Sequence, residues 1–259
     1  MVELFIKHVL GVGTGRPGLY GDTAGYYGTV EQQGRLTLHL HMLLWIKNSL
    51  TPQEVRDRIL GADSEFQKDM IQYLESAHTG EFLGGSMNDI HQEIQMRDIE
   101  DADRIDPTMT LPEAPPLECE AHQSESANAN CEPCQRLPSW WSRFRQTVDE
   151  LIFRSNRHTC HAGCTNKKYP SCKSRFPREV RAETSVDPET GSVQLKKGEA
   201  WINTFSPVLT YLIRCNSDVT SLLSGTAIKS IIAYVTDYVT KTPLKTHVIL
   251  EVIKSVFNR

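Results

Sequence analysis

Long apolar runs are scarce in this sequence of 259 residues, of which 39% are hydrophobic and 23% are charged. No run approaches the roughly 20 apolar residues that a membrane-spanning helix needs, and no apolar stretch follows a basic N-terminal region. We therefore expect neither a membrane anchor nor a secretory signal. Without such a signal, the seven cysteines are expected to be reduced thiols or metal ligands and not disulfides.

A phosphate-binding loop is also missing from the sequence. The glycine-rich stretch GVGTGRPG at residues 11–18 is not followed by Gly-Lys-Ser/Thr, and Pro17 interrupts it. The backbone cradle and the lysine that hold nucleotide phosphates are therefore absent from this loop. The sequence excludes an ATP-driven helicase motor of this class.

An excess of basic charge is lacking overall, since the formal net charge is −4, but the average conceals two opposite segments. Residues 89–132 hold twelve acidic and two basic residues, which leaves about +6 for the rest of the chain. Residues 154–181 hold eight Lys or Arg and a single acid. The first segment is typical of an acidic linker, and the second is a basic patch that would attract a polyanion.

Two histidines lie on one face of a predicted strand. Apolar residues alternate from Leu36 to Ile46, so Thr37, His39 and His41 share the opposite face. A hairpin over residues 26–46, with its turn at 33–35, would pair Glu31 with Thr37. Glu31 would then lie on the histidine face, whereas a two-residue turn would put it on the other. The three side chains are either metal ligands or simply the solvent face of the strand.

A predicted helix over residues 226–240 carries two tyrosines that its apolar stripe does not include. Tyr234 and Tyr238 are one turn apart, and Lys241 falls on the same arc. A tyrosine with a pKa near 10 attacks a phosphodiester usefully only when a metal polarises the phosphate and a cation steadies the developing charge. Tyrosines that border the core of an amphipathic helix are the alternative.

Cysteine and histidine gather in two groups of four, and each group is suited to one tetrahedral zinc ion. The alternative for both is a set of free thiols in an irregular loop, and His161 is a possible replacement for His158. The first group consists of Cys119, His122, Cys131 and Cys134. The second consists of His158, Cys160, Cys164 and Cys172, inside the basic segment.

The His-x-His strand together with the Tyr-x3-Tyr helix resembles the HUH endonucleases, which act in rolling-circle replication. Three segments are similar in sequence to the replication-initiator ("helicase-like") domain of Helitron transposases, particularly fungal ones. They are YYGTVEQQGRLTLHLHMLLWI, CKSRFPRE and SGTAIKSIIAYVTDYVTK. The resemblance runs through nearly the whole chain. Relatives of this kind carry a C-terminal superfamily 1 helicase, and this sequence begins inside what resembles a longer domain, so upstream strands of the sheet are expected to be missing.

The resemblance implies roles for six residues. His39 and His41 match the paired histidines that hold Mg²⁺ or Mn²⁺, and Glu31 stands where related nucleases keep an acidic ligand. Tyr234 and Tyr238 match the paired nucleophiles, and Lys241 matches the lysine that follows them. The implied reaction nicks single-stranded DNA at transposon ends and leaves a 5′-phosphotyrosine. A nuclear location follows from such a target.

The expected fold is α+β, with a central antiparallel sheet of HUH-nuclease type, flanking helices and an irregular Cys/His-rich insertion. Residues 1–85 and 181–259 would form the nuclease domain, 86–135 an acidic flexible insertion, and 136–180 a helix with the basic Cys/His-rich segment. Two alternatives stay open. One is an inactive transposon remnant that acts at most as a zinc-stabilised DNA-binding module, and the other is an unrelated metallohydrolase.

Overall fold

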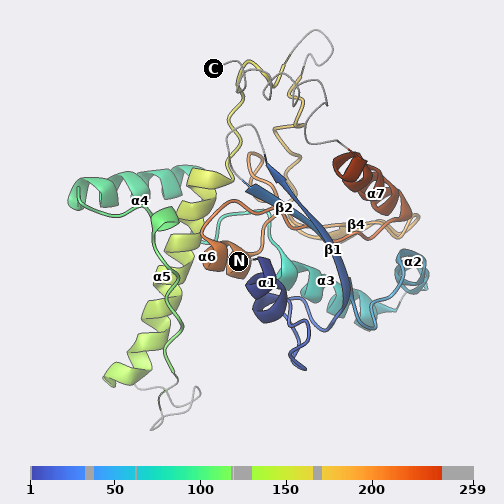
Figure 1. The fold of residues 1–259 in the computed structure, drawn as a ribbon, viewed down its shortest axis with the longest axis horizontal. Coiled ribbons are helices and arrows are strands. Elements are labelled where there is room, and N and C mark those ends of the chain that lie inside the picture. The colour runs from blue at the N-terminus through green and yellow to red at the C-terminus, as the bar shows by residue number, and fades with distance from the viewer. Residues whose placement is uncertain are drawn as a thin grey trace, which may run out of the picture. The chain divides into compact units, whose positions relative to one another are not determined.

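The computed structural model describes residues 2–32, 38–61, 63–117, 119, 130–165 and 171–240. The chain divides into two compact units (Figure 1). Unit 1 combines the two ends of the chain, Met1–Ala62 and Leu222–Arg259, and unit 2 is Asp63–Ser221. The domain limits after residues 85, 135 and 180 stay predictions. No helix in the described ranges is long and apolar enough to cross a membrane.

Unit 1 is built around one antiparallel hairpin. The hairpin is preceded by a short helical segment and followed by a helix whose start is set locally: Thr51 caps it, Pro52 occupies its first turn, and Glu54 closes a capping box. The elements are α1 (Val2–Leu4), η1 (Phe5–Val9), β1 (Thr23–Gln32), β2 (Leu38–Ile46), α2 (Pro52–Leu60) and α7 (Gly225–Thr240). The hairpin and helix α7 were expected from the sequence.

The register of the hairpin differs from the expected one by two residues. Glu31 pairs with His39, and Gln32 pairs with Leu38, so the connection spans residues 33–37, which are outside the described residues. The predicted pairing of Glu31 with Thr37 is therefore wrong. A shift of two residues keeps every side chain on its face, and Glu31 still shares a face with His39.

At the Leu38 end of β2, the two faces are buried in the opposite sense from the prediction. Leu38 is 72% exposed and Leu40 is 38% exposed, whereas His39 and His41 are both half-buried. The predicted apolar face is thus the more open one at this end of the strand. The reason is tertiary: alternation tells which residues share a face, but only the neighbouring elements determine which face they cover.

Unit 2 is mainly helical, with a long central helix and one very short hairpin. Its elements are α3 (Ser64–Ala77), α4 (Met87–Glu100), η2 (Pro107–Met109), α5 (Glu132–Ser155), β3 (Ser185–Val186), β4 (Val193–Gln194) and α6 (Pro207–Ile213). The fold is therefore α+β as expected. The central HUH-type sheet is not found among the described residues, where each of the two sheets has two strands.

Helix α4 lies where an irregular acidic insertion was expected. Its start is a capping box between Ser86 and Asp89, and Ile90 and Ile94 are buried, with 2% and 4% exposure. These two isoleucines form an apolar strip one side chain wide, which is too narrow to stand out as helical periodicity in an acidic segment.

Helix α5 carries the hydrophobic core of unit 2. It begins at Glu132, before the segment 136–180 in which a helix was expected, and it continues through Pro138. Its buried side chains recur at helical spacing and pack against the segment around α6. The core cluster includes Trp140, Phe144, Val148, Ile152, Ile202, Phe205 and Tyr211.

A fully buried carboxylate, Glu150, joins α4 to α5. Its exposure is 0%, and three guanidinium groups surround it. Arg154 Nε donates to Glu150 Oε1 at 2.9 Å, Arg97 lies 3.3 Å from Oε2, and Arg104 contacts both carboxylate oxygens. Asp98 accepts from Arg104 and Arg154 on the outer side. The helices and the loop after α4 are therefore held by charges that satisfy one another.

Replacing Glu150 with glutamine should destabilise the protein by about 3 kcal/mol, because it leaves three half-buried guanidinium charges without their buried partner. The measurement is the free energy of unfolding in urea. Glu132→Gln is the matched control, since Glu132 forms an exposed pair with Arg136 one turn along the same helix, and it should cost at most about 0.5 kcal/mol. Equal losses in the two variants would contradict this role.

A second buried acid, Asp149, caps the loop before α4. Its two carboxylate oxygens accept the backbone N–H groups of Leu83 and Gly84, each at 2.7 Å. Burial raises the pKa of Asp149 from 3.8 to about 6. Between those two pH values the folded chain binds a proton that the unfolded chain has released. The contribution of this carboxyl to stability is therefore complete below the unfolded pKa and is lost as the pH rises through about 6.

Comparison with Asp149→Asn, which cannot titrate, should reveal this dependence. The free energy of unfolding of the wild type minus that of the variant should fall between about pH 4.5 and about pH 7. Urea unfolding at both pH values measures the difference. A difference that does not change with pH would show that the carboxyl keeps its ordinary pKa.

Candidate functional site

The first candidate site is the histidine face of the hairpin in unit 1. Glu31 on β1 lies directly opposite His39 on β2, and His41 is the next residue along the same face. Glu31 Oε2 lies 3.4 Å from His41 Nε2, and both atoms are buried. The carboxylate therefore reaches diagonally across the hairpin to the second histidine.

This donor set suits a divalent cation, with one carboxylate oxygen and two imidazole nitrogens. Among the described residues, two other groups have all their ligand atoms within 4.8 Å of one another, one around His158 and one around Cys119. The ligand atoms of Glu31, His39 and His41 are not as close together. The shared face and the contact between Glu31 and His41 fit such a group.

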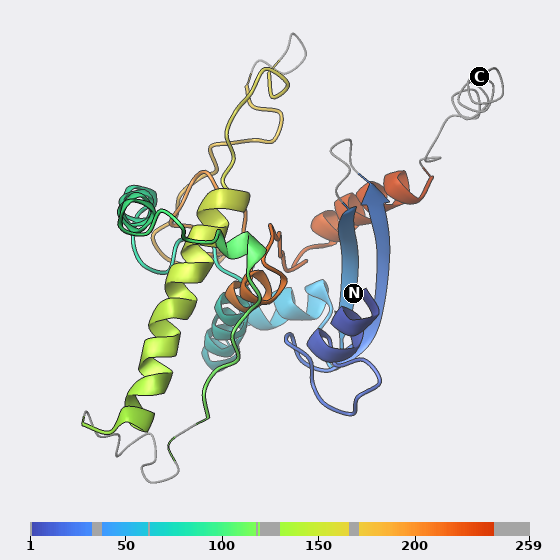
Figure 2. The same cartoon turned by 60° about the vertical axis from the view of Figure 1, so that its left-hand side comes forward.

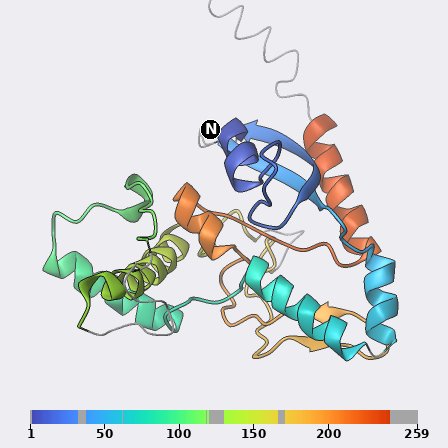
Figure 3. The same cartoon turned by 90° about the horizontal axis from the view of Figure 1, so that it is seen from below.

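Helix α7 lies beside β1, the strand that carries Glu31 (Figures 2 and 3). The helix includes Tyr234 and Tyr238, as predicted, and their spacing of four residues puts them on one side of it. Their side chains and the whole of Lys241 lie outside the described residues. The approach of the tyrosines to the histidines therefore stays a prediction.

The second candidate site is a Cys/His cluster in unit 2, just after the end of α5. All four predicted ligands come together there. His158 Nε2 lies 3.4 Å from the sulfur of Cys160, 3.7 Å from that of Cys164 and 3.3 Å from that of Cys172. A metal ion such as zinc fits between these atoms.

The histidine of this cluster is His158, and the alternative, His161, makes other contacts. The Nδ1 atom of His161 accepts the backbone N–H of Gly163 at 3.1 Å, and its carbonyl accepts the N–H of Cys164. His161 therefore shapes the turn that presents Cys164. Sequence spacing alone left both histidines open because they are only three residues apart.

A third group consists of Cys119, Cys131 and Cys134, with Cys119 and Cys131 sulfurs 3.9 Å apart. Cys131 is the N-cap of α5 and Cys134 lies in its first turn. These are three of the four predicted ligands. The fourth, His122, lies outside the described residues.

The two adjacent tryptophans of α5 differ in burial. Trp140 is 6% exposed and packs in the core, where its indole N–H donates to the Glu113 carbonyl. Trp141 is 46% exposed and meets Trp140 edge-on. Trp140 therefore anchors the core, whereas only the exposed Trp141 has a ring that is open to stacking by a nucleic-acid base.

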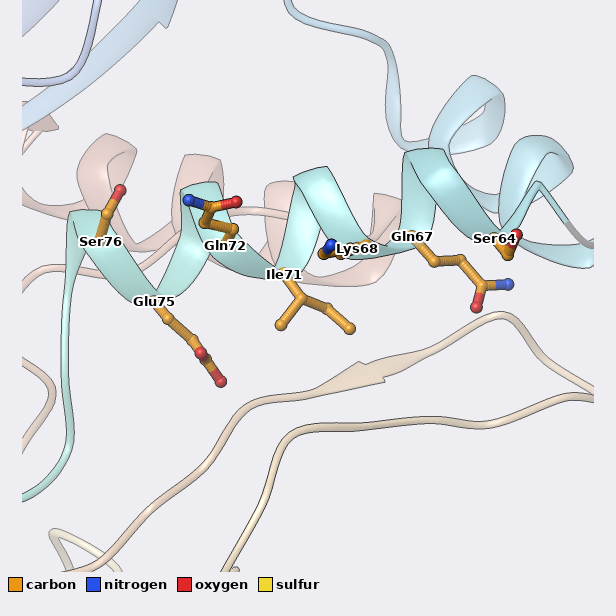
Figure 4. Close-up of a pocket in the computed structure, with 7 residues that line it drawn as sticks. All are labelled: Ser64, Gln67, Lys68, Ile71, Gln72, Glu75 and Ser76. Atoms are coloured by element: carbon orange, nitrogen blue, oxygen red, sulfur yellow. The ribbon is translucent and has the colours of Figure 1, made fainter.

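An open groove runs along α3 in unit 2. Figure 4 shows its lining side chains pointing in several directions and not converging on one point. All of them come from a single helix, and they are Ser64, Gln67, Lys68, Ile71, Gln72, Glu75 and Ser76. This arrangement does not resemble a catalytic site.

Sequence reasoning missed the aromatic support of the Cys/His cluster. The His158 ring stacks on Phe176 with centroids 4.3 Å apart and planes 11° apart, and Phe176 is nearly parallel to Trp201. Phe176 belongs to the CKSRFPRE segment, which the sequence comparison had already singled out. Its contact with His158 joins residues 18 positions apart, so this contact could not be predicted from the sequence.

The described fold is a mixed α+β chain with Cys/His clusters that could hold a metal ion. Residues 1–44 match the model of the family described as the Helitron helicase-like domain at the N-terminus. The matched segment includes Glu31, His39 and His41. No curated protein and no solved structure matches the chain. The match supports a role related to Helitron transposases, in agreement with the resemblance stated from the sequence.

Proposed function

We propose that this chain is a DNA-nicking and strand-transfer domain of a Helitron-type transposase. The observation that supports this function best is the hairpin face on which Glu31, His39 and His41 lie together, inside the segment that matches the Helitron model. The position of α7 beside β1 adds support, because this helix carries the two candidate nucleophiles.

The proposed reaction is a transesterification on single-stranded DNA. The hydroxyl of Tyr234 or Tyr238 loses its proton, and its oxygen attacks the phosphorus of a phosphodiester. The bond from phosphorus to the 3′ oxygen breaks, and that oxygen takes up a proton to become a free 3′-hydroxyl. The new 5′-phosphotyrosine keeps the energy of the phosphodiester, so attack by a 3′-hydroxyl can rejoin strands without ATP.

Glu31, His39 and His41 would hold the divalent ion, Mg²⁺ or Mn²⁺, beside the scissile phosphate. When bound, the ion supplies Lewis-acid polarisation of the phosphate oxygens. Lys241 would contribute a positive charge next to the attacked phosphate. Two tyrosines would let the domain hold one strand while it cuts another, at transposon ends in the nucleus and together with a helicase domain.

A second candidate function is nucleic-acid binding without cleavage. It is favoured by the Cys/His cluster in the basic segment 154–181, where Lys173 and Arg175 are exposed. In that case the chain would be a remnant that keeps a metal-stabilised DNA-binding fold but not the nicking chemistry.

Incubation of the full chain with a labelled single-stranded oligonucleotide and Mn²⁺ should give a covalent protein–DNA adduct on a denaturing gel. The double variant Tyr234→Phe/Tyr238→Phe should form none, because neither ring then offers a hydroxyl to attack phosphorus. His39→Ala and His41→Ala should each reduce the adduct by at least about 100-fold, since both contribute to the metal site.

Tyr73→Phe is the matched control, because it removes a tyrosine hydroxyl from α3 in the other unit, where the residue is 44% exposed, and it should leave adduct formation unchanged. Retarded DNA without an adduct would overturn the nuclease in favour of the binding module. Cleavage that leaves nothing attached to the protein would instead indicate a metallohydrolase that uses water as its nucleophile.

A further inference from the structure

We propose that His158, Cys160, Cys164 and Cys172 bind one zinc ion that clamps the chain after α5. This structural site lies in unit 2, whereas the proposed nuclease metal belongs to unit 1. It stands independently of the nicking activity. A chain that cuts no DNA would still be expected to hold this ion.

The spacing of the four ligand atoms is that of a tetrahedral zinc site. Zn–S bonds of about 2.3 Å and Zn–N bonds of about 2.0 Å at tetrahedral angles put nitrogen and sulfur about 3.6 Å apart. The three distances from His158 Nε2 to the sulfurs are 3.3, 3.4 and 3.7 Å. All four ligand atoms lie within 4.8 Å of one another. Free thiols have no reason to converge on one imidazole nitrogen in this way.

The histidine is held in place from two directions. Its backbone N–H donates to the Trp201 carbonyl at 2.8 Å, and its ring stacks on Phe176, which is itself buried. These contacts restrict the ring so that Nε2 faces the sulfurs. Orientation of a ligating imidazole by its surroundings is a regular feature of metal sites.

Two tight turns present the cysteines. The N–H of Cys164 donates to the His161 carbonyl, and the N–H of Arg175, which has a φ of 63°, donates to the Cys172 carbonyl. The turns are joined to each other by a 2.7 Å hydrogen bond from the N–H of Lys173 to the carbonyl of Cys164.

The site is closed, which indicates a structural and not a catalytic metal. Four protein ligands fill a tetrahedral shell and leave no position for water or substrate. Few residues in the described parts of 157–178 are buried, so apolar packing alone offers little to hold this segment together. The ion would supply that cohesion and keep the basic residues Lys173, Arg175 and Arg178 on a defined backbone.

The test measures the metal content of the full chain, purified without chelator, by mass spectrometry. Because the cluster of Cys119, Cys131 and Cys134 can also take up metal, each variant is compared with the wild type. His158→Asn and Cys172→Ser should each lose one equivalent of zinc. The matched controls are His161→Asn, three residues away but not a ligand, and Cys215→Ser, a cysteine outside both clusters; both should keep the wild-type content.

A further variant guards against misfolding as the cause of metal loss. His158→Cys should keep the wild-type stoichiometry, because it replaces one zinc ligand with another. With Co²⁺ in place of zinc, its sulfur-to-metal charge-transfer absorption should increase, since a fourth thiolate joins three. Retention of all zinc by His158→Asn, or an unchanged Co²⁺ spectrum in His158→Cys, would overturn the proposal.

Discussion

The charge of Glu150 is the constraint on which unit 2 depends. A carboxylate with no exposure to water is tolerable only where cations and hydrogen bonds replace its solvation. Arg97, Arg104 and Arg154 provide them from α4, from the loop after it and from α5 itself. The acidic segment therefore cannot separate from α5 without exposing or stranding these charges. A stretch whose composition is typical of a flexible linker is tied to the core in this way.

Helix α5 connects this network to the Cys/His cluster. One stripe of the helix, with Phe144 and Val148, forms the core, Glu150 lies on another side, and the chain reaches His158 three residues after the helix ends at Ser155. The rigid helix α5 thus positions His158, while two turns bring Cys164 and Cys172 to this histidine. If these four side chains bind a metal ion, this arrangement lowers the conformational entropy that they lose on binding it.

The hairpin of unit 1 illustrates how far a pattern predicts a site. Alternation placed His39 and His41 on one face, and the hairpin brought Glu31 to that face even though its partner is not the predicted one. Parity survived because the error was two residues, the period of a strand. The burial of that face was not predictable, since it depends on which elements pack nearby. The predicted approach of Tyr234 and Tyr238 to this face would depend on the tertiary arrangement in the same way.

The sequence by itself determined the features that residues a few positions apart can specify: the capping box of Thr51 and Glu54, the common face of the two histidines, and the spacing of the four ligands from His158 to Cys172. Only the tertiary structure decided the partner of Glu31, the choice of His158 over His161, and the enclosure of Glu150. The physical reason is range. Helix caps and strand faces follow from local backbone geometry, whereas register, ligand choice and burial of charge are settled by contacts between residues distant in the chain.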